Sequence, residues 1–348
     1  MIKLTPVAGA SGVSVVENNQ DTYPHLHERW IYYPKKHTVT GKLRSYYSWL
    51  SLYKNEIALF IEKNGLPDLV HVHIPFKAGL IARWVKKKYR IPYVVTEHWD
   101  GYNHIVADNF YSRNFLFKRV IAHTFKNADG VHSVSDYLGI QINRAVGKMS
   151  YCIINNVADE SVFSPLDEHK EEHRKFQLLH VSNGAEKKNV QGIIDAFLKL
   201  DGTGFALTIV GLPQQMNEVY KLKYPQVDFS GKMPYEKIAE EMRNAAALVI
   251  FSNSENAPCI IGEAFCCGLP VIATKVGGIP ELVDHSNGIL VKAGDVEGLK
   301  TAVLAMRANY KMYDMQKIAA DAKGKFGYDV IGKQFNAWYN SILKIANK

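Results

Sequence analysis

Two carboxylates, Glu255 and Glu263, stand in the segment Phe251–Pro270, which reads FSNSENAPCIIGEAFCCGLP. An apolar strand, Leu248–Ser252, leads into this segment, and a helix is expected to begin near Pro258, because proline is tolerated in a first helical turn. The free amides and the dipole at such a helix N-terminus suit a phosphate or diphosphate. Glu263 could accept hydrogen bonds from ribose hydroxyls and Glu255 from those of a sugar. On spacing alone, both could equally be ordinary surface carboxylates.

The ends of this helix follow from its sequence. Asn256 or Ala257 is the expected N-cap, and Gly268 and Pro270 end the helix. Since the helix follows a strand, its N-terminus is expected at the carboxyl end of a parallel sheet, where doubly wound folds bind ligands. The amides expected to point outward are those of Cys259, Ile260 and Ile261.

A longer pattern runs from Glu255 to Glu281: Glu-x7-Glu, then Ala-x3-Gly-x-Pro-Val-Ile-Ala-Thr-x2-Gly-Gly-x2-Glu. This pattern resembles the family 4 retaining glycosyltransferases of the GT-B fold, also called glycosyltransferase group 1. The resemblance implies an α/β protein with two Rossmann-like, doubly wound parallel-sheet domains facing a central cleft. The matching positions are Glu255, Glu263, Ala264, Gly268, Pro270, Val271, Thr274, Gly277, Gly278 and Glu281.

The resemblance extends from about Pro67 to the C-terminus and assigns further residues. It implies catalytic roles for His98, Glu255 and Lys188, with Lys188 gripping the donor diphosphate. The family's arginine position holds Asn183, a departure for which Lys187 could compensate, although asparagine lacks the cationic fork of arginine. The resemblance implies donor-binding roles for Asn183, Lys187, Gly211, Lys232, Met233, Cys259, Ile260, Ile261 and Glu263. Among these, Gly211 and the Gly231–Met233 loop are expected to flank the nucleobase. The alternative is that their glycines only form turns.

The implied mechanism retains the configuration of the transferred sugar and needs no metal ion. The acceptor hydroxyl would attack on the leaving-group face and give its proton to the departing phosphate, while His98 hydrogen-bonds the donor sugar. The sequence has no Asp-x-Asp triplet, and Lys188 with the helix amides could stabilise the diphosphate instead. We therefore expect no cofactor and no metal site, and a nucleoside-diphosphate sugar, with UDP-sugar favoured, as substrate.

Short β-rich runs alternate with helical stretches along the chain, which is typical of parallel βαβ units. The pattern predicts two domains, residues 1–165 on the acceptor side and 166–327 on the donor side, joined by the charged linker Pro165–Lys175. Strands are expected at residues 12–16, 30–33, 69–73, 93–96, 130–134, 151–154, 178–181, 207–210, 227–230, 248–252, 271–274 and 288–291, and helices of the first half at 43–63, 79–89 and 114–126.

The two ends of the chain carry further expectations. The last helix, Tyr328–Ile345, has an apolar residue at every third or fourth position, so one face must pack on another element. The resemblance implies that residues 328–348 cross back to the first domain. At the other end, a signal peptide is not expected, because Pro6 and several Ser and Gly residues interrupt the weakly apolar stretch Leu4–Val16. The first predicted strand is Gly12–Val16, so the family's first βα unit is expected to be missing.

Composition and charge narrow the protein class and its partners. With 348 residues, 47% hydrophobic and 22% charged, the chain is neither disordered nor of low complexity. Its four cysteines show no CxxC spacing, which favours a reducing cytoplasm. Of the net charge of +8, most lies in residues 1–165, with 20 basic and 13 acidic side chains. Such a surplus suits nucleic acid or an anionic membrane, but no nucleic-acid-binding motif is present.

The resemblance favours a membrane and implies a glycan or lipid-linked acceptor in surface polysaccharide or glycolipid biosynthesis. Two basic clusters could meet anionic headgroups on the inner face of the plasma membrane, or could be solvated helix faces. These clusters are Lys77, Arg83, Lys86, Lys87, Lys88 and Arg90, and Arg113, Lys118 and Arg119 beside Phe115 and Phe117. The alternative function is a non-catalytic protein of the GT-B fold that binds sugar nucleotides or glycans.

Overall fold

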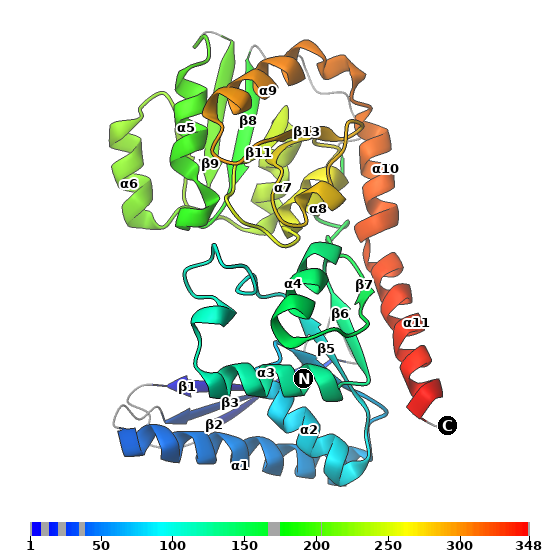
Figure 1. The fold of residues 1–348 in the computed structure, drawn as a ribbon. Coiled ribbons are helices and arrows are strands. Elements are labelled where there is room, and N and C mark those ends of the chain that lie inside the picture. The colour runs from blue at the N-terminus through cyan, green and yellow to red at the C-terminus, as the bar shows by residue number, and fades with distance from the viewer. Residues whose placement is uncertain are drawn as a thin grey trace.

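The computed structural model describes residues 2–7, 14–19, 26–34, 39–165, 175–202 and 204–346 of the chain. Most of the predicted linker Pro165–Lys175 lies outside these residues, as do the first residues of the predicted strand Gly12–Val16. In the described part, two α/β domains stack one above the other, and the last two helices run along the side of both (Figure 1). None of the described helices is both long and apolar enough to cross a bilayer.

The second domain is built on a six-stranded parallel sheet in the order β10-β9-β8-β11-β12-β13. Leu178 and Leu179 belong to separate hydrophobic cores, because successive side chains of a strand point to opposite faces. The strands are β8 (Phe176–Val181), β9 (Phe205–Val210), β10 (Asp228–Ser230), β11 (Ala247–Ile250), β12 (Val271–Thr274) and β13 (Gly288–Val291). The helices are α5 (Val190–Leu198), α6 (Gln214–Lys223), α7 (Tyr235–Asn244), α8 (Cys259–Cys266) and α9 (Val296–Ala308).

The order of the strands reverses between β8 and β11, which are neighbours in the sheet although far apart in the sequence. In open parallel sheets, ligands bind at the carboxyl ends of the strands at such a reversal. The loop after β8 holds Lys188, and the loop after β11 holds Glu255. The topology therefore brings two of the predicted catalytic residues to the same place.

The first domain contains a four-stranded parallel sheet in the order β4-β5-β6-β7 and a separate three-stranded sheet in the order β1-β3-β2. The four-stranded sheet consists of β4 (Val70–His73), β5 (Tyr93–Glu97), β6 (Gly130–Ser133) and β7 (Cys152–Ile153), and the smaller one of β1 (Ile2–Val7), β2 (Ser14–Asn19) and β3 (His27–Pro34). The helices are α1 (Val39–Asn64), α2 (Ala78–Tyr89), α3 (Phe115–Asn127) and α4 (Asp136–Val146).

The small sheet differs from the sequence prediction in two ways. The prediction that the first strand begins at Gly12 is wrong, because β1 precedes it. Pro6 made this segment a poor strand candidate, but β1 is an edge strand, where proline is tolerated. The small sheet also departs from the predicted parallel βαβ pattern, since β2 pairs with β3 in the antiparallel sense. Among the described residues, the element that follows β1 is therefore the strand β2 and not a helix.

The last two helices connect the domains. α10 (Met315–Phe326) packs against α8 of the second domain, and α11 (Tyr328–Ala346) lies along the first domain (Figure 1). The ring of Trp338 contacts those of His71 and His132, and the Tyr339 hydroxyl lies 2.7 Å from His71 Nδ1. The apolar face of α11 thus packs against the first domain, although Ile345 at the end of the helix is 72% exposed.

Candidate active site

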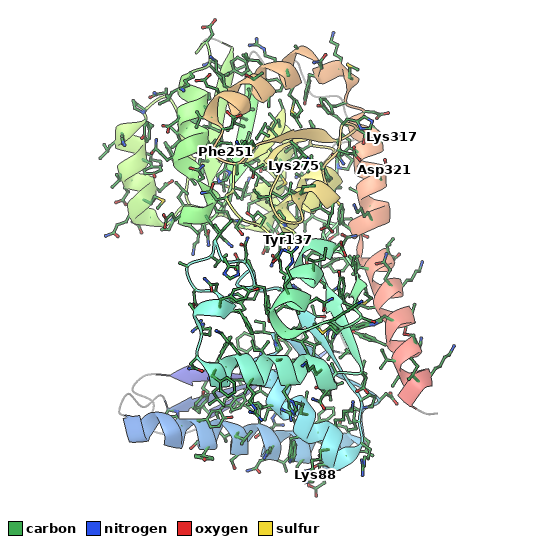
Figure 2. All side chains as sticks on the ribbon, in the orientation of Figure 1. Lys88, Tyr137, Phe251, Lys275, Lys317 and Asp321 are labelled. Carbon is green, nitrogen blue, oxygen red and sulfur yellow. The ribbon has the colours of Figure 1, made fainter. Side chains whose placement is uncertain are left out.

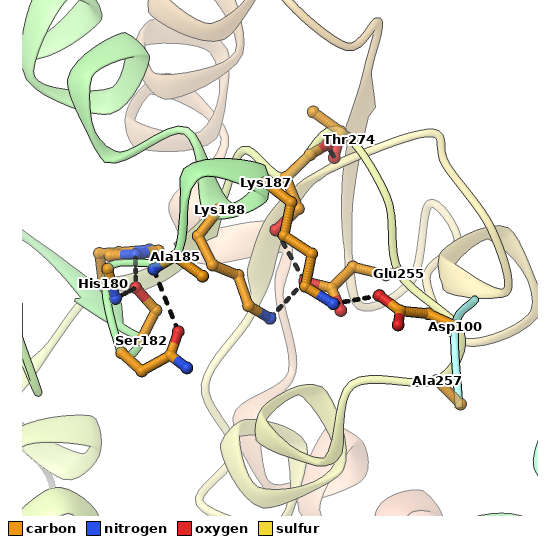
Figure 3. A network of polar contacts seen from close by, with 12 residues as sticks. Asp100, His180, Ser182, Ala185, Lys187, Lys188, Glu255, Ala257 and Thr274 are labelled. Carbon is orange, nitrogen blue, oxygen red and sulfur yellow. Dashed lines mark hydrogen bonds and ion pairs between the residues drawn. The ribbon is translucent and has the colours of Figure 1, made fainter. Parts of the chain in front are cut away.

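Lys188 and Glu255 form an ion pair at the carboxyl edge of the second sheet, with Lys188 Nζ 2.5 Å from Glu255 Oε1 (Figure 3). Lys188 ends the short 3-10 helix Glu186–Lys188 in the loop after β8. Asn189 then adopts a left-handed backbone with φ of 48°, which asparagine tolerates better than most residues. Its side chain caps α5 by accepting a hydrogen bond from Gly192 N at 3.2 Å. This turn fixes the direction in which the Lys188 side chain points from the loop.

The Glu255 carboxylate is only 5% exposed and is held from within the second domain. Its Oε1 accepts a hydrogen bond from Ser252 Oγ at 2.7 Å in addition to that from Lys188. Thr274 Oγ1, at the end of β12, donates to Ser252 O at 2.6 Å and so ties the turn to the next strand. No described residue donates to Glu255 Oε2. A buried carboxylate with one oxygen fixed and the other open suits a sugar hydroxyl.

Lys187 lies beside Lys188 but reaches the other domain, where it forms an ion pair with Asp100 in the loop after β5 (Figure 3). Asn183, at the position of the family's arginine, turns its side-chain oxygen back to accept from Ala185 N at 3.2 Å. Two lysines, each paired with a carboxylate, therefore stand where the resemblance places the donor diphosphate, and Asn183 adds no cation.

Helix α8 begins at Cys259, with Pro258 at the N-cap in place of the two residues expected there. The expected free amide of Ile261 is wrong, because Ile261 N donates to Pro258 O at 3.1 Å. This bond joins residue i to residue i−3, as in a 3-10 turn, and so tightens the first turn of α8. The amides of Cys259 and Ile260 remain as candidates for binding a phosphate group.

Glu263 lies on α8 and is partly buried. Burial raises the pKa of its carboxyl from the usual 4.5 to about 7. No hydrogen bond or ion pair from the described part of the chain reaches this carboxylate. Removing an unpaired carboxylate from water costs free energy, which the hydroxyl groups of a ligand would offset. Glu263 thus has the environment that the predicted ribose contact requires.

Gly211 joins the ends of neighbouring strands at the same edge of the sheet. Its N–H donates to Ser230 O at 3.0 Å, and its φ is 94°. A Cβ atom at this position would lie 2.7 Å from Ser182 O, so only glycine fits here. The exposed Lys232 and the partly buried Met233 follow β10 directly. The three residues predicted to flank the nucleobase are therefore close to the ends of adjacent strands.

His98 directly follows β5 at the carboxyl edge of the first sheet. Its backbone oxygen accepts from Asn256 Nδ2 at 3.0 Å, and its Nε2 lies 3.4 Å from His73 Nδ1. Burial and the neighbouring His73 lower the pKa of His98, which keeps its imidazole neutral at pH 7. Asn256 thus joins the strand end that carries His98 to the turn that carries Glu255.

The turn between β11 and α8 contacts the first domain at two further points. Ser254 Oγ accepts from Asn103 Nδ2 at 3.3 Å, and Ala257 O accepts from Asn156 Nδ2 at 2.8 Å. Asn103, Asn156 and Asp100 were not among the predicted site residues. Their one signal in the sequence is that Asp100 and Asn103 are polar residues shortly after a strand. The turn that holds Glu255 therefore forms part of the interdomain surface.

The surroundings of His71, which lies on the same strand as His73, indicate a structural role. Its Nε2 lies 2.6 Å from Thr96 Oγ1, and its Nδ1 lies 2.7 Å from the Tyr339 hydroxyl. Burial, with smaller effects from nearby histidines, lowers its pKa to about 3. Within the described ranges, no group of three or more His, Cys, Asp or Glu side chains could hold a metal ion.

Two family models match successive parts of the chain and together span both domains. Residues 13–161 match Glycosyltransferase Family 4, and residues 166–323 match Glycosyl transferases group 1. The chain belongs to the family 4, group 1 glycosyltransferases. In this glycosyltransferase, the first match covers the domain that carries His98 and the second the domain that carries Lys188 and Glu255.

Curated relatives and solved structures agree with this membership. This glycosyltransferase is 26% identical over 295 residues to N-acetyl-alpha-D-glucosaminyl L-malate synthase of Bacillus anthracis, covering 80% of the present chain and 75% of the relative. It is 24% identical over 320 residues to a putative teichuronic acid biosynthesis glycosyltransferase of Bacillus subtilis, covering 89% and 78%. Anabaena HepE, solved in complex with UDP, superposes with a TM-score of 0.72 at 19% identity, covering 90% and 86%. The fold is GT-B.

Proposed function

We propose that this glycosyltransferase moves a sugar from a UDP-sugar to a glycan or lipid-linked acceptor, with retention of configuration and without a metal ion. The Lys188–Glu255 ion pair carries the proposal. It joins a cation suited to a diphosphate and a buried carboxylate suited to a sugar at the point where the strand order reverses. The UDP complex of HepE supports the donor class, and the teichuronic acid relative supports the acceptor class.

The donor would lie along the carboxyl edge of the second sheet. Lys188 and Lys187 would exchange their present carboxylate partners for oxygens of the diphosphate, in charge-assisted hydrogen bonds. The amides at the start of α8 would bind the same group. Glu263, which has no described partner, would accept hydrogen bonds from the ribose. The nucleobase would lie beside Gly211, Lys232 and Met233.

In the proposed step, the acceptor oxygen bonds to the anomeric carbon on the face from which the diphosphate departs, and the bond from that carbon to the diphosphate oxygen breaks. The proton of the acceptor hydroxyl passes to the departing phosphate oxygen, so that no protein base is needed. Lys188 stabilises the negative charge that develops on the diphosphate. Glu255 holds a hydroxyl of the transferred sugar, and the neutral His98 hydrogen-bonds that sugar from the first domain.

The acceptor side of the proposal rests on the surface of the first domain. At the start of α3, Phe115 is 73% and Leu116 69% exposed, and the Arg119 guanidinium lies 5.8 Å from the Phe115 ring. Lys88 of the other basic cluster lies at the outer end of the first domain (Figure 2). We propose that this surface meets anionic headgroups on the cytoplasmic face of the plasma membrane. Co-sedimentation with phosphatidylglycerol vesicles is the expected result, and its absence would contradict this contact.

A thermal-shift screen with UDP-, GDP- and ADP-sugars tests the donor. A donor at 100 times its Kd would stabilise the protein by about 2.7 kcal/mol, and we expect this response with a UDP-sugar. Product analysis by NMR should show the anomeric configuration of the donor, and turnover should be unchanged by EDTA. The proposal fails if no nucleoside-diphosphate sugar shifts the Tm, if the product is inverted, or if EDTA abolishes turnover.

A further inference from the structure

Glu281 closes the sequence pattern that begins at Glu255, and its side chain reaches across the domain boundary. Its Oε2 accepts from Asp136 N at 2.8 Å, and its Oε1 accepts from Tyr137 N at 2.9 Å. These are the first two amides of α4, which belongs to the first domain. Figure 2 shows Tyr137 where the two domains meet. One carboxylate of the second domain thus binds a helix end of the first with both of its oxygens.

Glu281 completes the N-terminus of α4. The amides of the first three residues of an α-helix have no partner inside the helix, because the fourth residue is the first whose amide reaches the carbonyl of the N-cap residue. Leu138 N donates to Ser135 Oγ at 3.2 Å, and Gly139 N donates to Ser135 O, also at 3.2 Å. The remaining two amides are those bound by Glu281. Its negative charge also lies at the positive end of the helix dipole, which favours this position.

Glu281 is fixed relative to the turn that holds Glu255, because the chain just before it packs on that turn. A Cβ atom on Gly277 would lie 1.6 Å from Glu255 O, and one on Gly278 would lie 2.1 Å from Asn256 O. Only glycine allows two backbone segments to approach this closely. The paired glycines of the sequence pattern therefore set the position from which Glu281 reaches α4.

The other end of this contact is fixed relative to His98. Helix α4 follows β6 after a two-residue connection, and β6 pairs in parallel with β5. In that pairing, Ser133 at the end of β6 is opposite Glu97 at the end of β5. His98 is the next residue in the chain. The start of α4 and His98 therefore stand at the same edge of the same sheet.

We propose that Glu281 is a positioning residue for sugar transfer. By capping α4 across the domain boundary, it sets the separation between the edge of the first domain that carries His98 and the turn that carries Glu255. This role rests on the proposed function, in which those two residues approach the donor sugar from opposite domains. Since the nucleotide contacts lie within the second domain, the loss of the cap should reduce turnover without weakening UDP binding.

The test compares the full-length variants Glu281→Gln and Glu160→Gln. The first change keeps the shape of the side chain but removes its charge and one of its two acceptor oxygens. Glu281 is on the surface, so the variant loses no core packing. Glu160 is a matched control, because its Oε2 accepts from Tyr328 N at 2.9 Å at the start of α11 but does not join the donor turn to α4.

In Glu281→Gln, we expect the amides of Asp136 and Tyr137 to exchange hydrogen about tenfold faster or more, and kcat at saturating donor to fall about three- to tenfold. The Kd for UDP should stay within about twofold. Glu160→Gln should change none of these quantities. An unchanged kcat would overturn the positioning role, and unchanged amide exchange would overturn the cap itself. Absence of transfer by the wild-type chain would instead refute the proposed function, while amide exchange still tests the cap.

Discussion

The raised pKa of Glu263 leads to a specific prediction about stability. Replacing this residue by glutamine should stabilise the unliganded protein strongly at about pH 8 and only slightly at about pH 5. Burial raises the pKa of the carboxyl from 4.5 to about 7 in the folded protein. Below about pH 4 the carboxyl is mostly neutral in both the folded and the unfolded states, whereas between about pH 4.5 and 7 only the unfolded chain ionises freely. As the pH rises through this range, the folded protein must carry a desolvated charge, and stability is lost.

The size of the effect follows from the two pKa values. A tenfold change in proton affinity corresponds to about 1.4 kcal/mol, so a rise from 4.5 to about 7 corresponds to at most about 3 to 4 kcal/mol. Glu263 is partly exposed to water, which reduces this figure, and we expect about 1–2 kcal/mol. For a domain of this size, that corresponds to a rise in Tm of about 2–8 °C.

Thermal unfolding of both proteins at the two pH values, with and without UDP, provides the assay. The variant should have a clearly higher Tm than the wild type at about pH 8, a much smaller difference at about pH 5, and a weaker response to UDP. Glu297→Gln is the control, because a hydrogen bond from Lys199 lowers the pKa of Glu297, and its replacement should not raise the Tm. An equal difference in Tm at both pH values would refute the electrostatic reasoning, and an unchanged UDP response would refute the ribose contact.

Two further predictions concern glycine and histidine. Gly277→Ala should destabilise the protein by about 2 kcal/mol or more in urea unfolding, because φ is 57° and the new Cβ would lie 1.6 Å from Glu255 O. Gly324→Ala, in α10 with no atom within 4 Å, should instead stabilise it by about 0.5–1 kcal/mol; the same sign for both would contradict the structure. Because burial and His73 lower the pKa of His98, kcat/KM should be constant from about pH 8 to 6.5 and fall only below that range, when it is measured in a Glu263→Gln background that removes the carboxyl with a pKa of about 7. A decline that begins above about pH 6.5 would exclude a neutral His98.

The strands of the second domain were predicted well, because the pattern that identifies each strand lies within a few neighbouring residues. Each strand of a sheet buried on both faces is a short apolar run between turn residues, as in Val271–Thr274, where the predicted and observed bounds agree. The first strand of the chain was missed because Pro6 breaks the strand pattern. Whether proline is tolerated depends on which strand lies at the sheet edge, and that is a property of the whole fold.

Only part of the candidate site was predicted, because some of its contacts join residues that are far apart in the sequence. Lys188 and Glu255 were found because each lies in a recognisable sequence pattern, and the sheet topology then pairs them. Asp100 was missed because its partner, Lys187, comes from the other domain. The hydrogen bond of the Ile261 amide was missed because it joins residue i to residue i−3, as in a 3-10 turn, and this tightening of the first helical turn has no signal in the sequence. Contacts across the domain boundary leave no local pattern in the chain.

The most direct test of the central claim is the steady-state release of UDP from a UDP-sugar, measured with acceptor for the wild type, Lys188→Ala and Lys199→Ala. Lys199 forms an ion pair with Glu297 on the surface and controls for the loss of a lysine elsewhere in the second domain. We predict that Lys188→Ala lowers kcat by about a hundredfold, equivalent to about 2.7 kcal/mol of transition-state stabilisation, and that Lys199→Ala stays within about twofold of the wild type. Equal rates in all three proteins would contradict the assignment of the Lys188–Glu255 pair to the reaction.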